Sequence, residues 1–334
     1  MRVSFWLVSS LFVFFSCKEK ESGKAANSEA EPDVHIEVPT FRDDSAHQFV
    51  KKQVDFGPRI PGTQAHKAAG DYLIKKMESL GATVFVQEFD QKTFDGASVR
   101  LRNIIASFFP EKSKRILLAA HWDTRPFADK DKSQPNALFD GANDGASGVA
   151  VLLEIARVTS HSTPPGVGID IIFFDGEDWG EGEYERTRLP SDLESWWCLG
   201  SQYWAKHKHK PNYSAYYGIL LDMVGAKGSQ FYRESLSLSY APRVVEKVWN
   251  TAERLGYSHI FVKRNQGEVT DDHKFVTEIG KIPMIDIVNY DPASGSFGSF
   301  HHTTADNIDL ISKEVLQAVG ATIINVIYYE HPGA

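Results

Sequence analysis

The sequence is poor in cysteine, which limits how the folded protein can be stabilised. Only Cys17 and Cys198 occur among its 334 residues. Because Cys17 lies in an N-terminal segment that we expect to be processed, no intrachain disulfide is expected in the mature protein. Its stability must then come from a hydrophobic core and from any bound metal ion. Cys198 stands between Trp197 and Leu199, which is typical of a small buried apolar residue.

The sequence also lacks an excess of basic residues. Its formal net charge of -8 at pH 7 argues against a nucleic-acid partner. Beyond Phe41 there is no linker rich in proline, glycine or serine and no internal repeat, so we expect a single domain over residues 39–334. The hydrophobic fraction of 42% is that of a globular protein.

The N-terminal apolar run is too short to span a membrane as a helix. It extends from Val3 to Phe15 behind Arg2, which is less than the ~20 residues that a transmembrane helix needs. A polar segment follows, and this order is expected of an export signal. We therefore expect residues 1–16 to be a signal peptide and residues 17–38 to be a disordered tether.

Ser16 before Cys17 resembles the cleavage site of a bacterial lipoprotein, although bulky phenylalanines precede it. This resemblance implies that Cys17 becomes the lipidated first residue of the mature protein. The protein would then be exported to the bacterial cell envelope as a periplasmic or outer-membrane lipoprotein, with the lipid anchor as its only membrane contact. The alternative is a plain secretory signal with an incidental cysteine.

The remaining chain alternates between short apolar runs and segments of helical periodicity. Buried strands are expected at 116–120, 169–174, 219–221 and 282–288, and a hairpin at a sheet edge is expected from 82–89 and 99–109. Helices are expected at 44–55, 65–80, 149–156, 199–207 and 244–255, and after the N-cap residue Ser312. This order predicts an α/β fold with an open, twisted, mostly parallel (mixed) sheet and helices on both faces.

Polar residues of ligand type follow each of the four predicted buried strands. In open α/β sheets the binding crevice lies beyond the carboxyl ends of the strands, so we expect these side chains to converge. They are His121 and Asp123 after the first strand, Asp144 before the next helix, Glu177 and Asp178 after the second strand, Asp222 after the third, and His301 and His302 after the fourth.

Carboxylates and imidazoles without cysteine form a ligand set that suits Zn²⁺. Taken alone, Asp144 is equally well explained as a helix-capping carboxylate, and a lone His302 is better explained as a polar loop residue. The repetition of such residues at successive strand ends favours a zinc site. Asp123 is placed to orient the ring of His121 as its hydrogen-bond partner.

Six motifs of the chain occur in an order that resembles a known superfamily. They are His121-x-Asp123, Gly141–Gly148, Asp175-Gly-Glu177-Asp178, Leu220–Gly225, Asp271-Asp272-His273 and His302-Thr303-x-x-Asp306. The superfamily is that of the zinc aminopeptidases and glutaminyl cyclases (peptidase family M28-like). The resemblance covers roughly residues 45–330 and implies a zinc-aminopeptidase-like (phosphorylase/hydrolase-like) fold.

The resemblance leaves two branches with different metal content. The aminopeptidase branch implies two zinc ions, with Asp144 as the bridge, His121 and Asp222 on one ion, and Asp178 and His302 on the other. Such an enzyme releases N-terminal amino acids. The cyclase branch implies one zinc ion per chain, held by Asp144, Asp178 and His302.

In the cyclase branch the resemblance implies that Glu177 acts as base and acid, beside a hydrogen-bonded pair formed by Asp222 and Asp271. The acidic doublet Asp271-Asp272 resembles that branch, although in isolation its default interpretation is an N-cap with solvated charge. We therefore expect a bacterial, animal-type glutaminyl-peptide cyclotransferase, which converts N-terminal glutamine of peptides and proteins to pyroglutamate. A metal-free binding module is the third alternative, and the complete set of ligands counts against it.

Glu177 and Asp178 are expected to differ in role, because adjacent residues of an extended chain point in opposite directions. Asp175 has no expected role beyond bracing the turn.

One position departs from the cyclase pattern. Cyclases of this type carry a tryptophan immediately before the zinc histidine, where this chain has His301. We expect Phe297 or Phe300 to supply the aromatic wall, and we include Trp179 and His301 among the substrate-pocket residues. The spacing to Thr303 and Asp306 favours His302 over His301 as the metal ligand.

Overall fold

The computed structural model describes residues 1, 2, 4, 36–182, 187–291 and 294–330. The predicted signal peptide, the predicted lipidation site Cys17 and most of the predicted tether lie outside these residues. From Ile36 onward the chain forms one compact unit, and Ile36 and Val38 already pack against its core. Among the described segments, no helix is both long and apolar enough to cross a bilayer.

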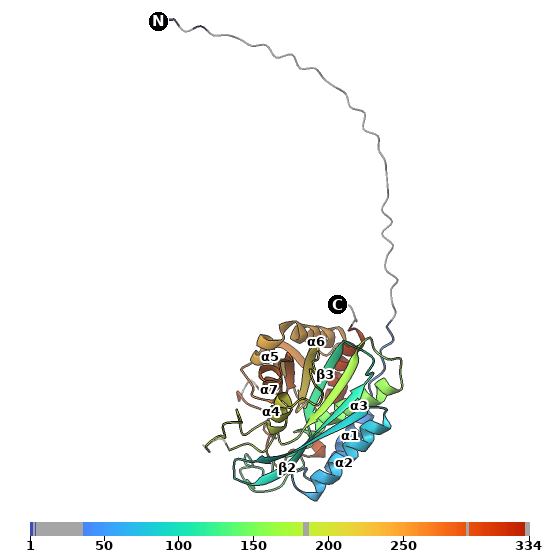
Figure 1. Ribbon diagram of the computed structural model, residues 1–334, viewed down its shortest axis with the longest axis vertical. Coiled ribbons are helices and arrows are strands. Elements are labelled where there is room, and N and C mark those ends of the chain that lie inside the picture. Colours follow the sequence, from blue (N-terminus) through green and yellow to red (C-terminus); the bar gives the residue numbers. More distant parts are fainter. Residues whose placement is uncertain (3, 5–35, 183–186, 292–293, 331–334) are drawn as a thin grey trace. The chain divides into compact units, whose positions relative to one another are not determined.

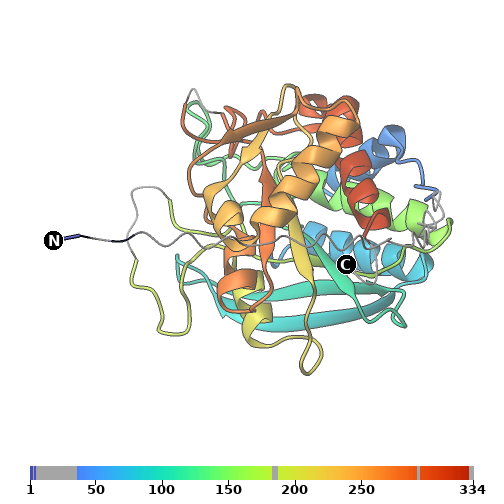
Figure 2. The ribbon, with the colours of Figure 1, turned by 90° about the horizontal axis from the view of Figure 1, so that it is seen from above.

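A mixed six-stranded sheet lies at the centre of this unit and confirms the predicted fold class. Its strands are β1 (Thr83–Lys92), β2 (Ser98–Phe108), β3 (Arg115–His121), β4 (Gly168–Phe174), β5 (Tyr217–Asp222) and β8 (Met284–Val288). They are ordered β1-β2-β4-β3-β5-β8. β2 is antiparallel to both β1 and β4, and the other neighbours are parallel. The β1–β2 hairpin therefore lies at one edge, as predicted (Figure 2).

The central strands bury both faces, which explains why they are continuous apolar runs. In β3, Ile116, Leu118 and Ala120 belong to one core, whereas Leu117 and Ala119 belong to the core on the opposite face. The edge strand β1 instead alternates between exposed and less exposed positions over its first half. The period of two along each strand thus divides the apolar residues between two cores.

Helices cover both faces of the sheet (Figure 1). The larger core contains residues of α1 (Asp43–Val54), α2 (Gln64–Ser79), α3 (Ala146–Ser160), α6 (Pro242–Arg254) and α8 (Lys313–Tyr328). The smaller core contains residues of α4 (Leu199–Lys206) and α7 (Asp272–Glu278). Each predicted helix is present, with ends that differ from the prediction by a few residues. Ser312 caps α8, because its hydroxyl accepts from the backbone N–H of Val315.

Four short elements were not predicted. They are β6 (Phe231–Arg233) and β7 (Phe261–Asn265), which form a separate parallel pair, α5 (Ser235–Tyr240) and the 3-10 helix η1 (Ile308–Leu310). Each is too short to show a clear period in the sequence.

Candidate active site

The strand ends bring the predicted polar residues to one cavity. His121 and Asp222 are the last residues of β3 and β5, and Asp144 lies two residues before α3. A cavity of about 680 Å³ opens at this edge of the sheet. Seven predicted residues are part of its lining: Asp144, Glu177, Asp178, Asp222, Asp271, His301 and His302. The predicted convergence at the carboxyl ends of the strands is therefore confirmed.

Close packing between α3 and β5 sets the position of Asp144. A Cβ atom at Gly148 would lie 2.1 Å from the carbonyl oxygen of Leu221, so only glycine lets the helix approach this strand. Asp306 then holds the turn before α3, because its carboxylate accepts from the N–H groups of Asn143 and Asp144 at 2.7 and 3.0 Å.

Asp144 is the centre of a buried group of metal-ligand type. Its Oδ2 lies 3.6 Å from Nε2 of His302 and 3.7 Å from Nε2 of His301. Asp178 joins the group, since its Oδ1 lies 3.0 Å from Nε2 of His302. Among the described residues, Asp144 Oδ2 is buried without a hydrogen-bond partner. An unsatisfied carboxylate oxygen facing imidazole nitrogens fits a divalent cation, and the oxygen and nitrogen donors fit zinc.

The two adjacent histidines differ in the partner of Nδ1. For His302 this atom lies 3.2 Å from Oδ1 of Asp129, a carboxylate that Arg125 binds through two nitrogens. A carboxylate only accepts, so it favours the proton on Nδ1 and leaves the Nε2 lone pair available to a metal. Trp197 stacks parallel to the His302 ring at a centroid distance of 5.9 Å.

His301 has the opposite partner. Its Nδ1 lies 2.8 Å from Nζ of Lys130, and an ammonium group can only donate. Nδ1 of His301 is therefore the acceptor, and the neutral ring carries its proton on Nε2. Burial and the neighbouring charge of His302 lower the pKa of His301 well below its usual value, so the ring is neutral. A protonated Nε2 is a hydrogen-bond donor and has no lone pair for a metal.

A second group of ligand-type atoms surrounds His121. Its Nε2 lies 3.0 Å from Asp144 Oδ1 and 3.2 Å from Asp222 Oδ1. Burial opposes a charge on His121, but the bonds to Asp123, Asp144 and Asp222 outweigh burial and raise its pKa well above the usual value. The three carboxylates therefore favour the protonated, positively charged form of His121 when no second cation is bound.

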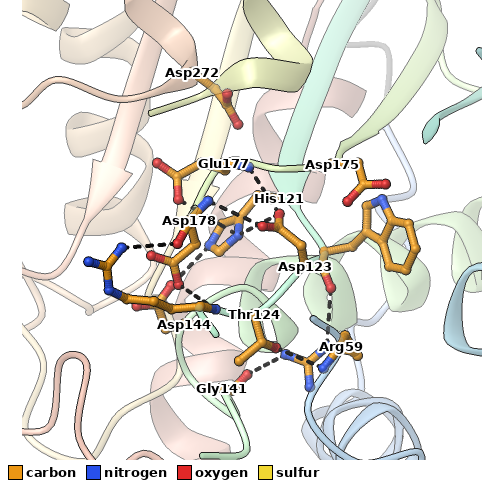
Figure 3. A network of polar contacts seen from close by, with 12 residues as sticks. Arg59, His121, Asp123, Thr124, Gly141, Asp144, Asp175, Glu177, Asp178 and Asp272 are labelled. Carbon is orange, nitrogen blue, oxygen red and sulfur yellow. Dashed lines mark hydrogen bonds and ion pairs between the residues drawn. The ribbon is translucent and has the colours of Figure 1, made fainter. Parts of the chain in front are cut away.

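Asp123 contacts His121 as predicted and also shapes the turn that follows β4. Its Oδ1 lies 3.5 Å from Nδ1 of His121. Its two oxygens accept from the backbone N–H groups of Glu177 and Asp178 at 3.1 and 3.2 Å (Figure 3). Asp123 therefore orients the backbone of the two residues whose side chains enter the cavity.

Glu177 lies in a largely buried position with few donors. Its Oε1 accepts from the thiol of Cys198 at 3.3 Å, and its Oε2 lies 3.9 Å from Nδ1 of His121. Burial, together with the charges of Asp271 and Asp178, raises the pKa of Glu177 well above its usual value. A raised pKa makes a carboxyl group a stronger base and suits it to general acid–base chemistry.

Cys198 is buried, as predicted, but it does more than fill space. Besides the thiol contact, its backbone N–H donates to the carbonyl of Glu177 at 2.9 Å, and Leu199 donates to Gly176 at 3.0 Å. Cys198 also adopts a left-handed backbone conformation, with φ of 58°. The start of α4 is thereby tied to the turn that carries Glu177.

Asp271 caps α7, because its side chain accepts from the N–H of Asp272. The capping interpretation is confirmed, but the expectation of a solvated charge is wrong, since Asp271 is only 4% exposed. Burial and the charge of Asp222 raise the pKa of Asp271 well above its usual value, and burial raises the pKa of Asp272 to about 7. Protonation of Asp271 and Asp272 is therefore favoured relative to that of a free aspartate.

Asp175 braces the turn, as expected. Its carboxylate accepts from Nε2 of His66 at 2.9 Å and from the N–H of Arg102 at 2.7 Å, and it points away from Glu177 (Figure 3). The ring of His66 stacks on Trp122. On the other side of the same strand end, Arg59 donates to the carbonyls of Trp122, Asp140 and Gly141.

The aromatic wall differs in part from the prediction. Phe297 and His301 line the cavity, but Trp179 and Phe300 do not. Trp179 packs in a separate core that also contains Leu199, and Phe300 packs beside Val269. The tryptophan that lines the cavity is Trp197. Which of the two tryptophans reaches the site depends on the path of the intervening loop, and the sequence has no periodic pattern there.

Four further residues of the site had no signal in the sequence. Arg59, Arg125, Asp129 and Lys130 occupy irregular segments, where charge alone is typical of a solvated surface. Arg125, Asp129 and Lys130 become recognisable only through their contacts with Asp178, His301 and His302.

Comparison with known proteins identifies the family. The sequence model of peptidase family M28 matches residues 103–327 of the chain. A glutaminyl cyclase structure from Bacteroides thetaiotaomicron is 47% identical, with a TM-score of 0.84, and covers 88% of this chain and 100% of its own. The glutaminyl cyclase of Porphyromonas gingivalis is 50% identical, with a TM-score of 0.81, over 86% of this chain and 98% of its own.

A Zn-dependent exopeptidase from Parabacteroides distasonis ATCC 8503 is equally similar, with 50% identity and a TM-score of 0.84, over 88% of this chain and 100% of its own. The chain spans about half the length of the first two curated relatives it matches, 51% of one and 47% of the other. The family match over residues 103–327 and the similarity to these solved structures show that the chain belongs to peptidase family M28 and is closely related to bacterial glutaminyl cyclases.

Proposed function

We propose that this protein is a glutaminyl-peptide cyclotransferase, which converts the N-terminal glutamine of peptides and proteins to pyroglutamate with release of ammonia. The observation that carries the proposal is a group of largely buried carboxyl side chains, Glu177, Asp222 and Asp271, which line the cavity beside the proposed zinc ligands. Glu177 and Asp271 both have raised pKa values, and the charge of Asp222 is one cause for Asp271. A cyclase needs such a group, because a proton must move from the attacking amine to the departing nitrogen.

The residues that would hold the zinc ion are Asp144, Asp178 and His302. The Nδ1 contacts of the two histidines support His302 over His301 in this role. When bound, zinc supplies Lewis-acid polarisation of the γ-carbonyl group of the glutamine side chain. His302 has a left-handed backbone with φ of 54°, a strained state of the kind that is found at functional sites.

Glu177 is proposed as the general base and acid. The α-amine of the substrate forms a bond to the γ-carbonyl carbon, and Glu177 accepts the proton that the amine loses. Glu177 then returns this proton to the amide nitrogen as the C–N bond breaks, so that ammonia leaves and the five-membered lactam remains. The reaction is intramolecular, so the cavity mainly has to hold the glutamine side chain folded back toward its amine.

Asp222 and Asp271 are proposed to bind the departing nitrogen. Burial and the charge of Asp222 raise the pKa of Asp271, so a protonated Asp271 would offer a donor and Asp222 an acceptor. Cys198 supports the chemistry from outside the cavity wall, since its thiol donates to Glu177 Oε1 and restricts that side chain.

The second candidate function is a two-zinc aminopeptidase. The convergence of His121, Asp144 and Asp222 favours it, as does the similarity to a Zn-dependent exopeptidase. Incubation of the zinc-loaded protein with Gln-initiated and Leu-initiated peptides separates the two. The cyclase proposal expects pyroglutamyl product, one zinc per chain and no released leucine. Leucine release with two zinc ions per chain would replace it with the aminopeptidase.

We also propose that the protein is exported and anchored through a lipid on Cys17. The proposal rests on the N-terminal sequence alone. The expected result is incorporation of labelled palmitate into the full chain, and its loss in the Cys17→Ala variant. Equal labelling of both proteins would contradict a lipid on Cys17.

A further inference from the structure

Lys130 is a cation at the cavity wall that the proposed chemistry does not use. Among the described residues that line the cavity, it is the only lysine or arginine. Its Nζ donates to Nδ1 of His301 at 2.8 Å and lies 5.9 Å from the centre of the Phe297 ring. Its backbone N–H donates to the carbonyl of His302 at 3.2 Å. Both ends of this exposed residue are therefore attached to the histidine pair.

The ammonium of Lys130 has donors to spare. An ammonium carries three N–H groups, and His301 accepts from one of them. Within the described ranges, no carboxylate forms an ion pair with Lys130. A lysine without a structural ion pair at the wall of a substrate cavity is available to a charge on the substrate.

The acids around the cavity are already engaged by other groups. Asp129 pairs with Arg125 and His302, and Glu181 accepts from the backbone and hydroxyl of Thr187. Asp144 and Asp178 belong to the proposed zinc group, where a bound cation offsets their charge. The positive charge of Lys130 is thus not cancelled by a fixed partner.

The imidazole ring of His301 lies between Lys130 and Asp144 of the proposed zinc group. Nε2 of His301 lies 3.7 Å from Asp144 Oδ2, and Nδ1 on the same ring lies 2.8 Å from Lys130. In the proposed reaction the glutamine side chain ends at the zinc group, and the next residue lies about 3.6 Å farther along the chain. The side chain of that next residue is therefore the part of the substrate within reach of Lys130.

We propose that Lys130 is a specificity-determining residue that favours substrates with an acidic residue immediately after the N-terminal glutamine, and that His301 positions its ammonium. The inference rests on the proposed cyclase function. It also explains why a histidine replaces the tryptophan of similar cyclases at this position, since an indole ring has no acceptor nitrogen to hold the lysine.

The test compares matched peptides that differ only at the second residue. Rates of pyroglutamate formation are measured for Gln-Glu and Gln-Gln peptides of otherwise identical sequence, since glutamate and glutamine differ in charge but hardly in shape. We expect kcat/KM to be about two- to fivefold higher for Gln-Glu, the size of an exposed ion pair, and the ratio to fall with added salt.

The Lys130→Met variant is expected to bring this ratio to about one, because the rate for Gln-Glu falls relative to the rate for Gln-Gln. Lys132→Met is the matched control, because Lys132 is exposed in the same loop and does not line the cavity. It removes the same charge and should keep the ratio. A wild-type ratio of one, or a ratio that survives in Lys130→Met, would overturn the proposal.

The role of His301 is tested with His301→Asn and His301→Phe, each checked for zinc content. Asparagine keeps an acceptor for Lys130 and should retain part of the preference for Gln-Glu, whereas phenylalanine should lose it. Equal loss of the preference in both zinc-loaded variants would contradict a positioning role for the acceptor atom.

A binding measurement tests the role of Lys130 independently of the proposed cyclase reaction. Calorimetry of the same two peptides with zinc-loaded Glu177→Gln protein does not require turnover. About two- to fivefold tighter binding of Gln-Glu supports Lys130 even if no peptide is cyclised, in which case only the cyclase function fails. Equal affinities, with pyroglutamate formed from both peptides by the wild type, would leave the cyclase intact and overturn the role of Lys130.

Discussion

The two sides of the cavity contain the same kind of residue in opposite states. On one side, burial would raise the pKa of Asp144, but the hydrogen bond and the charge of His121 lower it below its usual value. On the other side, Glu177 and Asp271 lie among further carboxyl groups, and their pKa values are raised. A carboxylate among imidazoles stays charged and suits a cation, whereas a carboxyl among carboxyls keeps a proton and suits proton transfer.

Asp178 lies between these two situations. It contacts His302, yet burial and the charge of Asp144 raise its pKa. A divalent cation between the two aspartates reverses the repulsion, which couples metal binding to proton release.

The largest expected effect on activity comes from a substitution at Asp144, on the side of the cavity that would hold the zinc ion. Asp144→Asn removes the carboxylate at the centre of the proposed zinc group, so zinc should be lost and activity should fall by about 10³-fold or more. Metal content and turnover are measured on the same preparation. Full zinc occupancy in this variant would contradict the assignment of Asp144 as a ligand.

Glu177→Gln tests the proposed role of Glu177 as general base and acid. The substitution keeps the shape and removes the proton exchange, so kcat should fall by about 10²- to 10⁴-fold while zinc content stays at the wild-type level. Loss of zinc together with activity would mean that Glu177 belongs instead to the side that would hold the zinc ion.

The different Nδ1 partners of His301 and His302 are tested by a substitution at Asp129. Asp129→Asn weakens the acceptor at Nδ1 of His302, so zinc affinity should fall by about 10- to 100-fold. Affinity is measured by competition with a chelator. Lys132→Met, which removes a charge from the same loop at an exposed residue outside the cavity lining, is the control and should leave zinc affinity unchanged.

The pH dependence of the wild type reports the raised pKa on the second side. Because the base must be ionised and burial raises the pKa of Glu177, kcat/KM should decline as pH falls through a value above the usual glutamate pKa. The decline approaches about tenfold per pH unit below that pKa. Constant activity down to the usual pKa of a glutamate would show that another group limits the rate.

The smallest expected effect is on stability, at Asp286 in β8. This carboxyl is fully buried, both oxygens lack a partner among the described residues, and burial with the charge of Asp271 raises its pKa well above its usual value. A raised pKa in the folded state means that stability decreases as pH rises from the unfolded to the folded pKa. Asp286→Asn should therefore raise Tm by about 2 °C or more at pH 8, and by less near pH 4. A lower Tm at pH 8 would indicate an unrecognised partner.

The fold was predictable from the sequence because its strands are buried on both faces. Such strands must be continuous apolar runs, and the polar residue that ends each run, such as His121 or Asp222, then marks the carboxyl edge of the sheet. The short pair β6–β7 escaped because three to five residues show no period. Trp179 was placed in the pocket instead of Trp197, since the path of a loop follows from packing and not from a repeat.

The sequence by itself determined the sheet, the helices and the set of polar residues at one edge, since each follows from local apolar periodicity and from strand ends. The tertiary structure alone decided which of these residues differ in chemical state. His301 and His302 are identical neighbours in the chain, but Lys130 donates to Nδ1 of His301, whereas the Asp129 carboxylate lies 3.2 Å from Nδ1 of His302. The pKa values of Glu177 and Asp144 separate for the same reason, because charge and burial depend on neighbours in space.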